Sequence, residues 1–178
     1  MSEKIVPAVD AAVLVPVFRD PAGDLRLVLI RRSEGGSHGG QIAFPGGKKE
    51  PVDRSMRETA LREADEEIGL TPDRVDVIAE LPRMDTRTTG FRIYPFLGRI
   101  QRPAQWRPYE REVAAVLEVP LSALSRPEAR GEEVRQFAGW ARAEQVPYLR
   151  IEEGQIWGAT YRILVGLVPR LQAGEWPL

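Results

Sequence analysis

The sequence contains no cysteine and only one histidine among its 178 residues. Without cysteine, the chain has no disulfide framework, no thiolate metal site and no cysteine nucleophile. No apolar run approaches the roughly 18 residues that read as a transmembrane helix. The N-terminal stretch MSEKIVPAVD also lacks the apolar segment of a signal peptide. We therefore expect a soluble, cytoplasmic protein with no membrane partner.

The chain also lacks an excess of charge of either sign. The 25 basic and 26 acidic residues leave a formal net charge of −1. A nucleic-acid-binding domain is usually basic, so we expect no nucleic-acid partner. With 43% hydrophobic residues, the chain has enough apolar material for a sizeable core, and we expect residues 1–178 to form one domain.

What the chain does have is a concentration of acids on one predicted helix, which follows a Gly-Gly segment, Gly46 and Gly47, that we expect to be a loop. Ser55 and Glu58 match a capping box, and Gly69 stands where a C-cap glycine belongs. These signals predict a helix from about Ser55 to Ile68.

Three glutamates of this helix, Glu63, Glu66 and Glu67, fall on one arc because positions i, i+3 and i+4 lie above one another. Like charges at that spacing destabilise a helix by some tenths of a kcal/mol per pair. A divalent cation held by oxygen ligands would remove this cost. A solvated acidic surface is the alternative interpretation of E-x-x-E-E taken alone.

The complete string resembles the signature of the Nudix hydrolase family, G-x5-E-x7-R-E-U-x-E-E-x-G-U, in which U is an aliphatic residue. The run Arg62–Leu70 matches the second half without a gap. In the first half, the spacing from Gly47 to Arg62 is one residue longer than the signature, and Arg54 takes the place of the first Glu. Either Glu50 or Asp53 could substitute for that carboxylate.

The resemblance implies a site for Mg²⁺ or Mn²⁺. The ligands would be the Gly47 carbonyl and the carboxylates of Glu63, Glu66 and Glu67. Arg62 would pair with a loop carboxylate such as Glu50, or with Glu58 one turn earlier in the helix, and so hold the acids in place.

The general base stays open. Glu63 and Glu66 are candidates by analogy with the family. Glu112 is a third candidate, because related enzymes carry an acid close to the metal just before a strand, and Glu112 precedes such an apolar run.

The segment before the helix narrows the resemblance to the coenzyme A pyrophosphatase branch, which carries R-S, a glycine-rich loop and then G-Q-x-A-F-P-G-G. The loop Ser33–Gly40 is one residue short and lacks the Arg of that branch. It contains His38, for which we expect a solvated position, with a phosphate or base contact as the alternative. The matching residues are Arg32, Ser33, Gly40, Gln41, Ala43, Phe44, Pro45, Gly46 and Gly47.

The candidate substrate-binding residues come from these matches and from the neighbouring strands. Arg31 and Arg32 alternate in direction if their strand persists, so only one of them can point at a diphosphate. Trp157 lies in a segment similar to the I-W-G-x-T of the branch, and we expect it in the core or at the interface of a homodimer. The candidates for substrate contact are Arg31, Arg32, Ser33, Gln41, Phe44 and Phe91.

Apolar strands between two amphipathic helices indicate an α/β fold, an α/β/α sandwich with a mixed sheet. This is also the Nudix fold that the resemblance implies. The second helix should run from the Trp157 segment to about Val168, where Pro169 is expected to interrupt it. The sequence of Arg126–Arg142 does not define a structure, and a hairpin is expected around Glu153 and Gly154. Strands are predicted at Ala11–Phe18, Leu25–Arg32, Val75–Leu81, Phe91–Ile100 and Glu112–Val119.

Three functions compete at this point. The first is hydrolysis of coenzyme A or a derivative to phosphopantetheine and 3′,5′-ADP. The second is a broader hydrolase acting on ADP-ribose, a dinucleotide or an oxidised nucleotide. The third is a Nudix-fold module that binds a nucleotide without cleaving it. Such a module is expected to lose acids from R-E-U-x-E-E, and this chain keeps them all.

Overall fold

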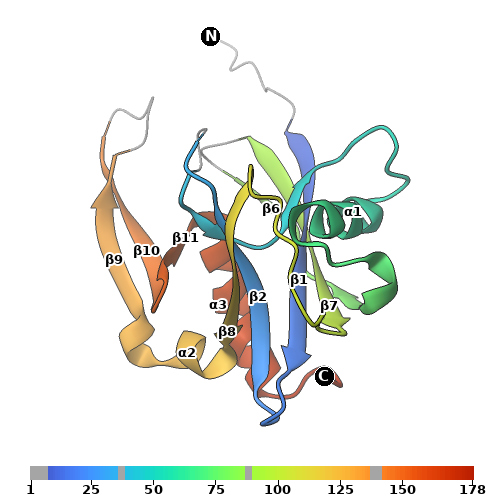
Figure 1. Cartoon of the computed structure of the whole chain (residues 1–178). Coiled ribbons are helices and arrows are strands. Elements are labelled where there is room, and N and C mark those ends of the chain that lie inside the picture. The colour runs from blue at the N-terminus through green and yellow to red at the C-terminus, as the bar shows by residue number, and fades with distance from the viewer. Residues whose placement is uncertain (1–7, 36–38, 87–89, 137–141) are drawn as a thin grey trace.

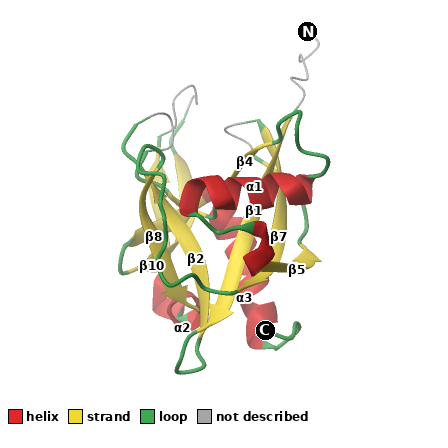
Figure 2. Ribbon diagram, turned by 45° about the vertical axis from the view of Figure 1, so that its right-hand side comes forward, coloured by secondary structure: helices red, strands yellow, loops and turns green. Residues whose placement is uncertain are grey.

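The computed structural model describes residues 8–35, 39–86, 90–136 and 142–178. A mixed sheet lies between α1 on one face and α2 and α3 on the other, with α1 in front and α3 behind in Figures 1 and 2. The predicted α/β/α sandwich is therefore confirmed. No helix in the described ranges is long and apolar enough to cross a membrane.

The main sheet has the strand order β3-β2-β1-β7-β5, with β4 on β1, β6 on β7 and β8 on β2. The pair β1–β7 is parallel, and the other pairs in the sheet are antiparallel. The strands are β1 Val9–Arg19, β2 Leu25–Arg32, β3 Ile42–Ala43, β4 Gly46–Lys48, β5 Val75–Glu80, β6 Met84–Asp85, β7 Phe91–Ile100 and β8 Val113–Pro120.

A second, three-stranded antiparallel sheet has the order β11-β10-β9 and contacts β3 through β11. It is visible at the left of Figure 1 in orange and red. The expected hairpin is present, and its turn lies between Ile151 and Gly154. The segment that the sequence left open contributes β9. The remaining strands and α-helices are β9 Arg130–Arg135, β10 Glu144–Ile151, β11 Gly154–Trp157, α1 Met56–Ile68, α2 Leu121–Ser125 and α3 Gly158–Gln172.

Alternation along β1 and β2 divides the core into two layers, because successive side chains point to opposite faces of a sheet. One layer packs against α1 and the other against α3. The same alternation sends Arg32 to the α1 face and Arg31 to the opposite face. From the two strands, the α1 layer takes Ala12, Leu14, Phe18, Val28 and Ile30, and the α3 layer takes Val15, Val17, Leu25, Leu27 and Leu29.

Two sequence expectations about secondary structure were wrong. Pro169 does not interrupt α3, which continues to Gln172. Proline removes one helical N–H, but Val168 before it and Leu171 after it are both buried, and the packing of this apolar stripe outweighs that loss. The Gly-Gly segment expected as a loop forms β4, where Gly47 pairs with Ala12 of β1.

Candidate active site

The acidic helix begins and ends where its capping residues predict. The Ser55 Oγ accepts a hydrogen bond from the Glu58 backbone N–H at 3.1 Å. Gly69 adopts the left-handed conformation, with φ of 67°, and closes the last turn. Ala60, Ala64 and Ile68 are fully buried in the α1 layer of the core. Packing of this stripe fixes the rotation of α1 and hence the direction in which its glutamates point.

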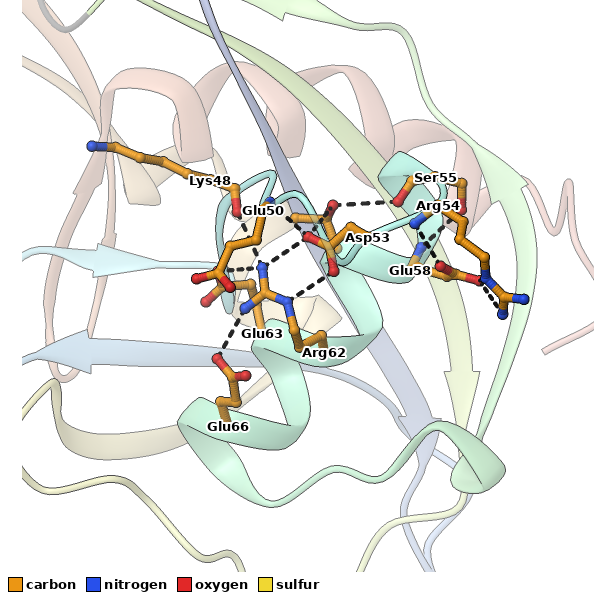
Figure 3. Close-up of polar contacts among 10 residues, drawn as sticks. Lys48, Glu50, Asp53, Arg54, Ser55, Glu58, Arg62, Glu63 and Glu66 are labelled. Atoms are coloured by element: carbon orange, nitrogen blue, oxygen red, sulfur yellow. Dashed lines mark hydrogen bonds and ion pairs between the residues drawn. The ribbon is translucent and has the colours of Figure 1, made fainter.

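Arg62 is the centre of the polar network on α1 (Figure 3). Its Nε lies 2.9 Å from Asp53 Oδ1, and its Nη2 lies 3.0 Å from Asp53 Oδ2. The same guanidinium contacts Glu63 Oε1 at 3.1 Å and Glu66 Oε2 at 2.9 Å. The planar fork of arginine allows this simultaneous contact with several carboxylates.

The carboxylate bound by the Arg62 fork is therefore Asp53, where the sequence offered Glu50 or Glu58. Glu58 is instead bound by Arg54, with Nη2 to Oε1 at 2.7 Å. Glu50 contributes a backbone N–H, which donates to Asp53 Oδ2 at 2.8 Å. A carboxylate at the tip of a turn cannot be distinguished from its neighbour by sequence spacing alone.

Asp53 is buried and fully occupied as an acceptor. The hydroxyl of Thr59, itself buried, donates to Asp53 Oδ2 at 2.9 Å. The hydrogen bonds from Arg62, together with those from Glu50 and Thr59, hold the pKa of Asp53 well below its usual range. The same pairing raises the pKa of Arg62. Asp53 is therefore a permanent anion that ties the loop before α1 to the acids of the helix.

Glu67 is the most deeply buried acid of the site, with 3% of its surface exposed. Its Oε2 accepts the Gly46 backbone N–H at 2.9 Å, and its Oε1 lies 3.8 Å from Arg32 Nη1. Burial raises the pKa of Glu67 to about 7, against the lowering effects of Gly46 and Arg32. Burial removes the water that would solvate the charge, so ionisation of Glu67 is unfavourable in this position.

Glu63 lies directly against the backbone of β4. A Cβ on Gly47 would stand 2.4 Å from Glu63 Oε1, so any larger residue here would displace this carboxylate from its position. Burial is the main cause that raises the pKa of Glu63. The charge of Glu112 raises the pKa of both Glu63 and Glu67, which places Glu112 within electrostatic reach of the two helix acids.

The segment before β8 binds the end of α1. The backbone N–H of Arg107 donates to the Ile68 carbonyl at 3.1 Å, and that of Tyr109 donates to the Glu67 carbonyl at 2.9 Å. Ser33 donates its backbone N–H to the Glu112 carbonyl at 2.9 Å. These contacts fix Glu112 beside the last turn of the helix.

A divalent cation fits this site by charge and donor type. Carboxylate oxygens are the ligands that Mg²⁺ prefers, and Glu63 and Glu67 repel each other and Glu112. In the part of the chain that the structure describes, no three acidic or histidine side chains already surround one point as ligands do. The carboxylates of Glu63 and Glu66 contact Arg62 instead. To bind a cation, these two carboxylates would have to contact the cation and Arg62 at the same time.

The structure separates the two candidate arginines of β2. Arg32 lies beside Glu67, on the same side of the sheet as the acids. Arg31 donates from Nη2 to the Glu153 carbonyl at 2.7 Å, in the hairpin between β10 and β11. Only Arg32 is therefore placed to meet a diphosphate at the acids.

The other candidates for substrate contact occupy different environments. The Ser33 hydroxyl donates to the Glu110 carbonyl at 2.9 Å and so helps to hold the segment before β8. Phe44 is buried, with 3% exposure, and packs in the α3 layer of the core, so its ring is not available to a ligand. Phe91 is half-buried, with Lys48 Nζ 5.6 Å from its ring centroid. His38 lies outside the described residues.

Gln41 lines an open pocket of about 450 Å³ between the segment before β3 and the three-stranded sheet. We call this the side pocket. Trp157 is half-buried and lines it rather than filling the core. Sequence reasoning missed Arg135 and Gln155, because both come from parts of the chain more than 90 residues from Gln41 and carry no local motif. The side pocket is lined by Gly39, Gly40, Gln41, Arg135, Gln155 and Trp157.

The fold and the acidic helix together define a class of protein, an α/β/α domain whose acids lie on one helix beside a glycine strand. The NUDIX domain model matches residues 9–156, and the chain belongs to the Nudix hydrolase family.

Known proteins agree with this assignment. The chain is 37% identical over 185 residues to a protein of Cronobacter sakazakii called "Uncharacterized Nudix hydrolase NudL", covering 99% of this chain and 89% of the relative. A MutT/nudix family protein from Enterococcus faecalis has a similar structure, with a TM-score of 0.63, 14% identity, and coverage of 98% of this chain and 64% of that one. The NUDIX domain of Shewanella oneidensis NrtR complexed with ADP ribose has a TM-score of 0.50 and 17% identity, covering 65% of this chain and 74% of that one.

Proposed function

We propose that this Nudix hydrolase cleaves the pyrophosphate bond of coenzyme A or a derivative, giving phosphopantetheine and 3′,5′-ADP. The observation that carries the proposal is the juxtaposition of Arg32 with the buried Glu67, next to the half-buried Glu63 and the glycine strand β4. A cation on one side and an excess of carboxylates on the other suit a substrate with two linked phosphates and a divalent cation.

Mg²⁺ or Mn²⁺ would be held by Glu63, Glu66, Glu67 and the Gly47 carbonyl. When bound, such an ion neutralises phosphate charge, orients the phosphate and lowers the pKa of the attacking water. Arg62 orients Glu63 and Glu66 through its contacts at 3.1 and 2.9 Å.

The reaction adds the water oxygen to one phosphorus while the bridging P–O bond breaks. The water proton passes to a carboxylate, for which Glu63, Glu66 and Glu112 are the candidates. Arg32 faces the diphosphate and stabilises the negative charge that the leaving phosphate gains.

The support for coenzyme A is the match of Gly40 to Gly47 with the G-Q-x-A-F-P-G-G of the coenzyme A pyrophosphatase branch. The second candidate function is hydrolysis of a wider set of nucleoside diphosphate derivatives, such as ADP-ribose. It is favoured by the loop Ser33–Gly40, which lacks the arginine of that branch.

Product analysis by phosphorus NMR tests the proposal. The protein is incubated with Mg²⁺ or Mn²⁺ and, separately, with coenzyme A, ADP-ribose and NADH. We expect 3′,5′-ADP and phosphopantetheine from coenzyme A. Cleavage of ADP-ribose or NADH at a higher kcat/KM than coenzyme A would favour the broader hydrolase. Binding without cleavage of any of the three would identify a nucleotide-binding module instead. The cytoplasmic location and a homodimer stay predictions, the latter open to sedimentation analysis.

A further inference from the structure

The side pocket is built around a braced arginine. The guanidinium carbon of Arg135 lies 4.4 Å from the centroid of the Trp157 ring. Its Nη2 donates to Gln155 Oε1 at 2.8 Å and is ion-paired with Glu133. Gln155 in turn donates from Nε2 to Glu133 Oε2 at 3.1 Å. Because all its neighbours hold it in one orientation, the guanidinium presents a fixed planar surface.

The charge in this pocket is balanced. The carboxylate of Glu133 neutralises the positive charge of Arg135. A phosphate that entered the pocket would therefore meet no net positive charge. Neutralisation of Arg135 does not weaken its stacking with an uncharged planar ring, because that stacking depends on the flat face of the guanidinium. The pocket is therefore better suited to a base than to a phosphate.

One polar side chain of the pocket is free to pair with the edge of such a ring. The side-chain amide of Gln41 lines the pocket and offers donor and acceptor together, the combination that pairs with the N6 and N7 edge of adenine.

The side pocket and the acids lie at two ends of one short segment. The Gln41 carbonyl accepts the backbone N–H of Arg32 at 2.9 Å, and Arg32 Nη1 lies 3.8 Å from Glu67 Oε1. The five residue-to-residue steps from Gln41 to Gly46 span at most about 18 Å when extended. A nucleotide with its base in the pocket can therefore direct its diphosphate along this segment towards Glu67.

We propose that the side pocket binds the adenine base of the substrate, with Arg135 stacking on the ring and Gln41 contacting its edge. Glu133 and Gln155 are positioning residues that hold the guanidinium flat. This inference rests on the proposed function for the identity of the whole substrate, but the base site has a test of its own.

The test uses AMP, which has no pyrophosphate bond, and ribose 5-phosphate, which has no base. Binding of each is measured by calorimetry with Mg²⁺ present, in the wild type and in Arg135→Ala. Base–side-chain stacking contributes about 1–3 kcal/mol, so we expect AMP to bind roughly ten- to a hundredfold more weakly to Arg135→Ala. Ribose 5-phosphate should bind equally to both. The matched control is Arg130→Ala, which removes an exposed arginine from the same strand.

Arg135→Lys separates stacking from charge, because lysine keeps the charge and loses the plane. We expect this variant to bind AMP as weakly as Arg135→Ala. Restoration of AMP binding by lysine, or equal loss of AMP and ribose 5-phosphate, would show a phosphate site and overturn the proposal. Unchanged AMP binding in Arg135→Ala would overturn it too.

Kinetics give the corresponding result on the working enzyme. With the best substrate of the NMR panel, Arg135→Ala should raise KM by roughly tenfold and leave kcat within about twofold, as loss of uniform binding requires. A fall in kcat with unchanged KM contradicts a base site. If no substrate is cleaved, the proposed function is wrong. The comparison of AMP binding between the wild type and Arg135→Ala still tests the base site in that case.

Discussion

The two polar regions of this molecule differ in how their charges are balanced. Around α1, Glu63, Glu66 and Glu67 share the positive charges of Arg62 and Arg32, and burial raises the pKa of Glu67 to about 7. In the side pocket, one arginine meets one glutamate. The first region has carboxylates whose charge a cation from solution would balance, whereas the second is already neutral. A charge change should therefore alter turnover in the first and affinity in the second.

Glu67→Gln should show the largest effect. The amide has the shape of the carboxylate and can still accept the Gly46 N–H, so the fold should persist. Loss of one strong electrostatic group should lower activity by about 10²-fold or more. Steady-state kinetics and calorimetric titration with Mg²⁺ measure the two consequences in parallel.

The control for this variant is Asp65→Asn, which makes the same change of charge at an exposed position of the same helix. It should leave turnover and Mg²⁺ affinity nearly unchanged. If Glu67→Gln behaves like this control, Glu67 is not a metal ligand, and the contrast between the two regions disappears.

Arg62→Ala should have the next largest effect. Asp53, Glu63 and Glu66 would lose the guanidinium that aligns them, and misplacement of reacting groups by about 1 Å can cost up to ~10²-fold. We expect a large fall in kcat. Arg54→Ala, which breaks the exposed pair with Glu58, is the matched control and should leave kcat unchanged. Equal kcat values in the two variants would show that Arg62 makes only surface ion pairs and does not align the acids.

Asp53→Asn should change stability and its pH dependence. A carboxyl whose folded pKa lies below its unfolded value of about 3.9 stabilises the protein above that pH and loses this contribution as the pH falls towards the folded value. At pH 7 the variant should be about 2 kcal/mol less stable, the scale of a buried hydrogen bond to a charge. Below about pH 4 the difference should shrink. Urea unfolding at pH 7 and pH 3 measures it, and a constant difference would contradict the linkage.

Selection of the 3′-phosphate of coenzyme A should show the smallest effect. The loop Ser33–Gly40 lacks the arginine of the coenzyme A branch, and Arg31 is occupied at Glu153. We expect kcat/KM for coenzyme A and for dephospho-coenzyme A to differ by less than about tenfold. A strong charge-assisted hydrogen bond to the 3′-phosphate would give a larger difference. A wild-type preference far above this, lost in Arg32→Ala, would show that Arg32 selects this phosphate.

The parts of the fold that sequence predicted depend on local chemistry. Ser55 and Gly69 fix the ends of α1 through bonds to residues three to five positions away, and such signals are legible in sequence. Pro169 carries an equally local signal, but the buried stripe of α3 overrides it. The family and the sandwich followed from the string Arg62–Leu70 together with strand alternation.

The parts that sequence did not predict depend on contacts between distant segments. The three glutamates predicted as metal ligands share one helix, although among the described residues they do not surround a common point. Asp53 could be distinguished from Glu50 only by the path of the turn, which points its carboxylate at Arg62. The side pocket forms because β9 and β11 lie beside the segment before β3. No sequence pattern within Arg126–Arg142 predicts that arrangement. Sequence therefore predicts the acids better than it predicts the pocket.

The segment that binds the end of α1 has a consequence for protein engineering. Residues 107–110 are exposed, and by exposure alone they would be a natural place to insert a tag or a peptide. Their backbone, however, supplies the donors to the carbonyls of Glu67 and Ile68. An insertion there would release the last turn of α1 together with its acids. The tolerant position is Ala104–Gln105, exposed residues just before this segment, because tolerance follows the backbone hydrogen bonds that an insertion breaks.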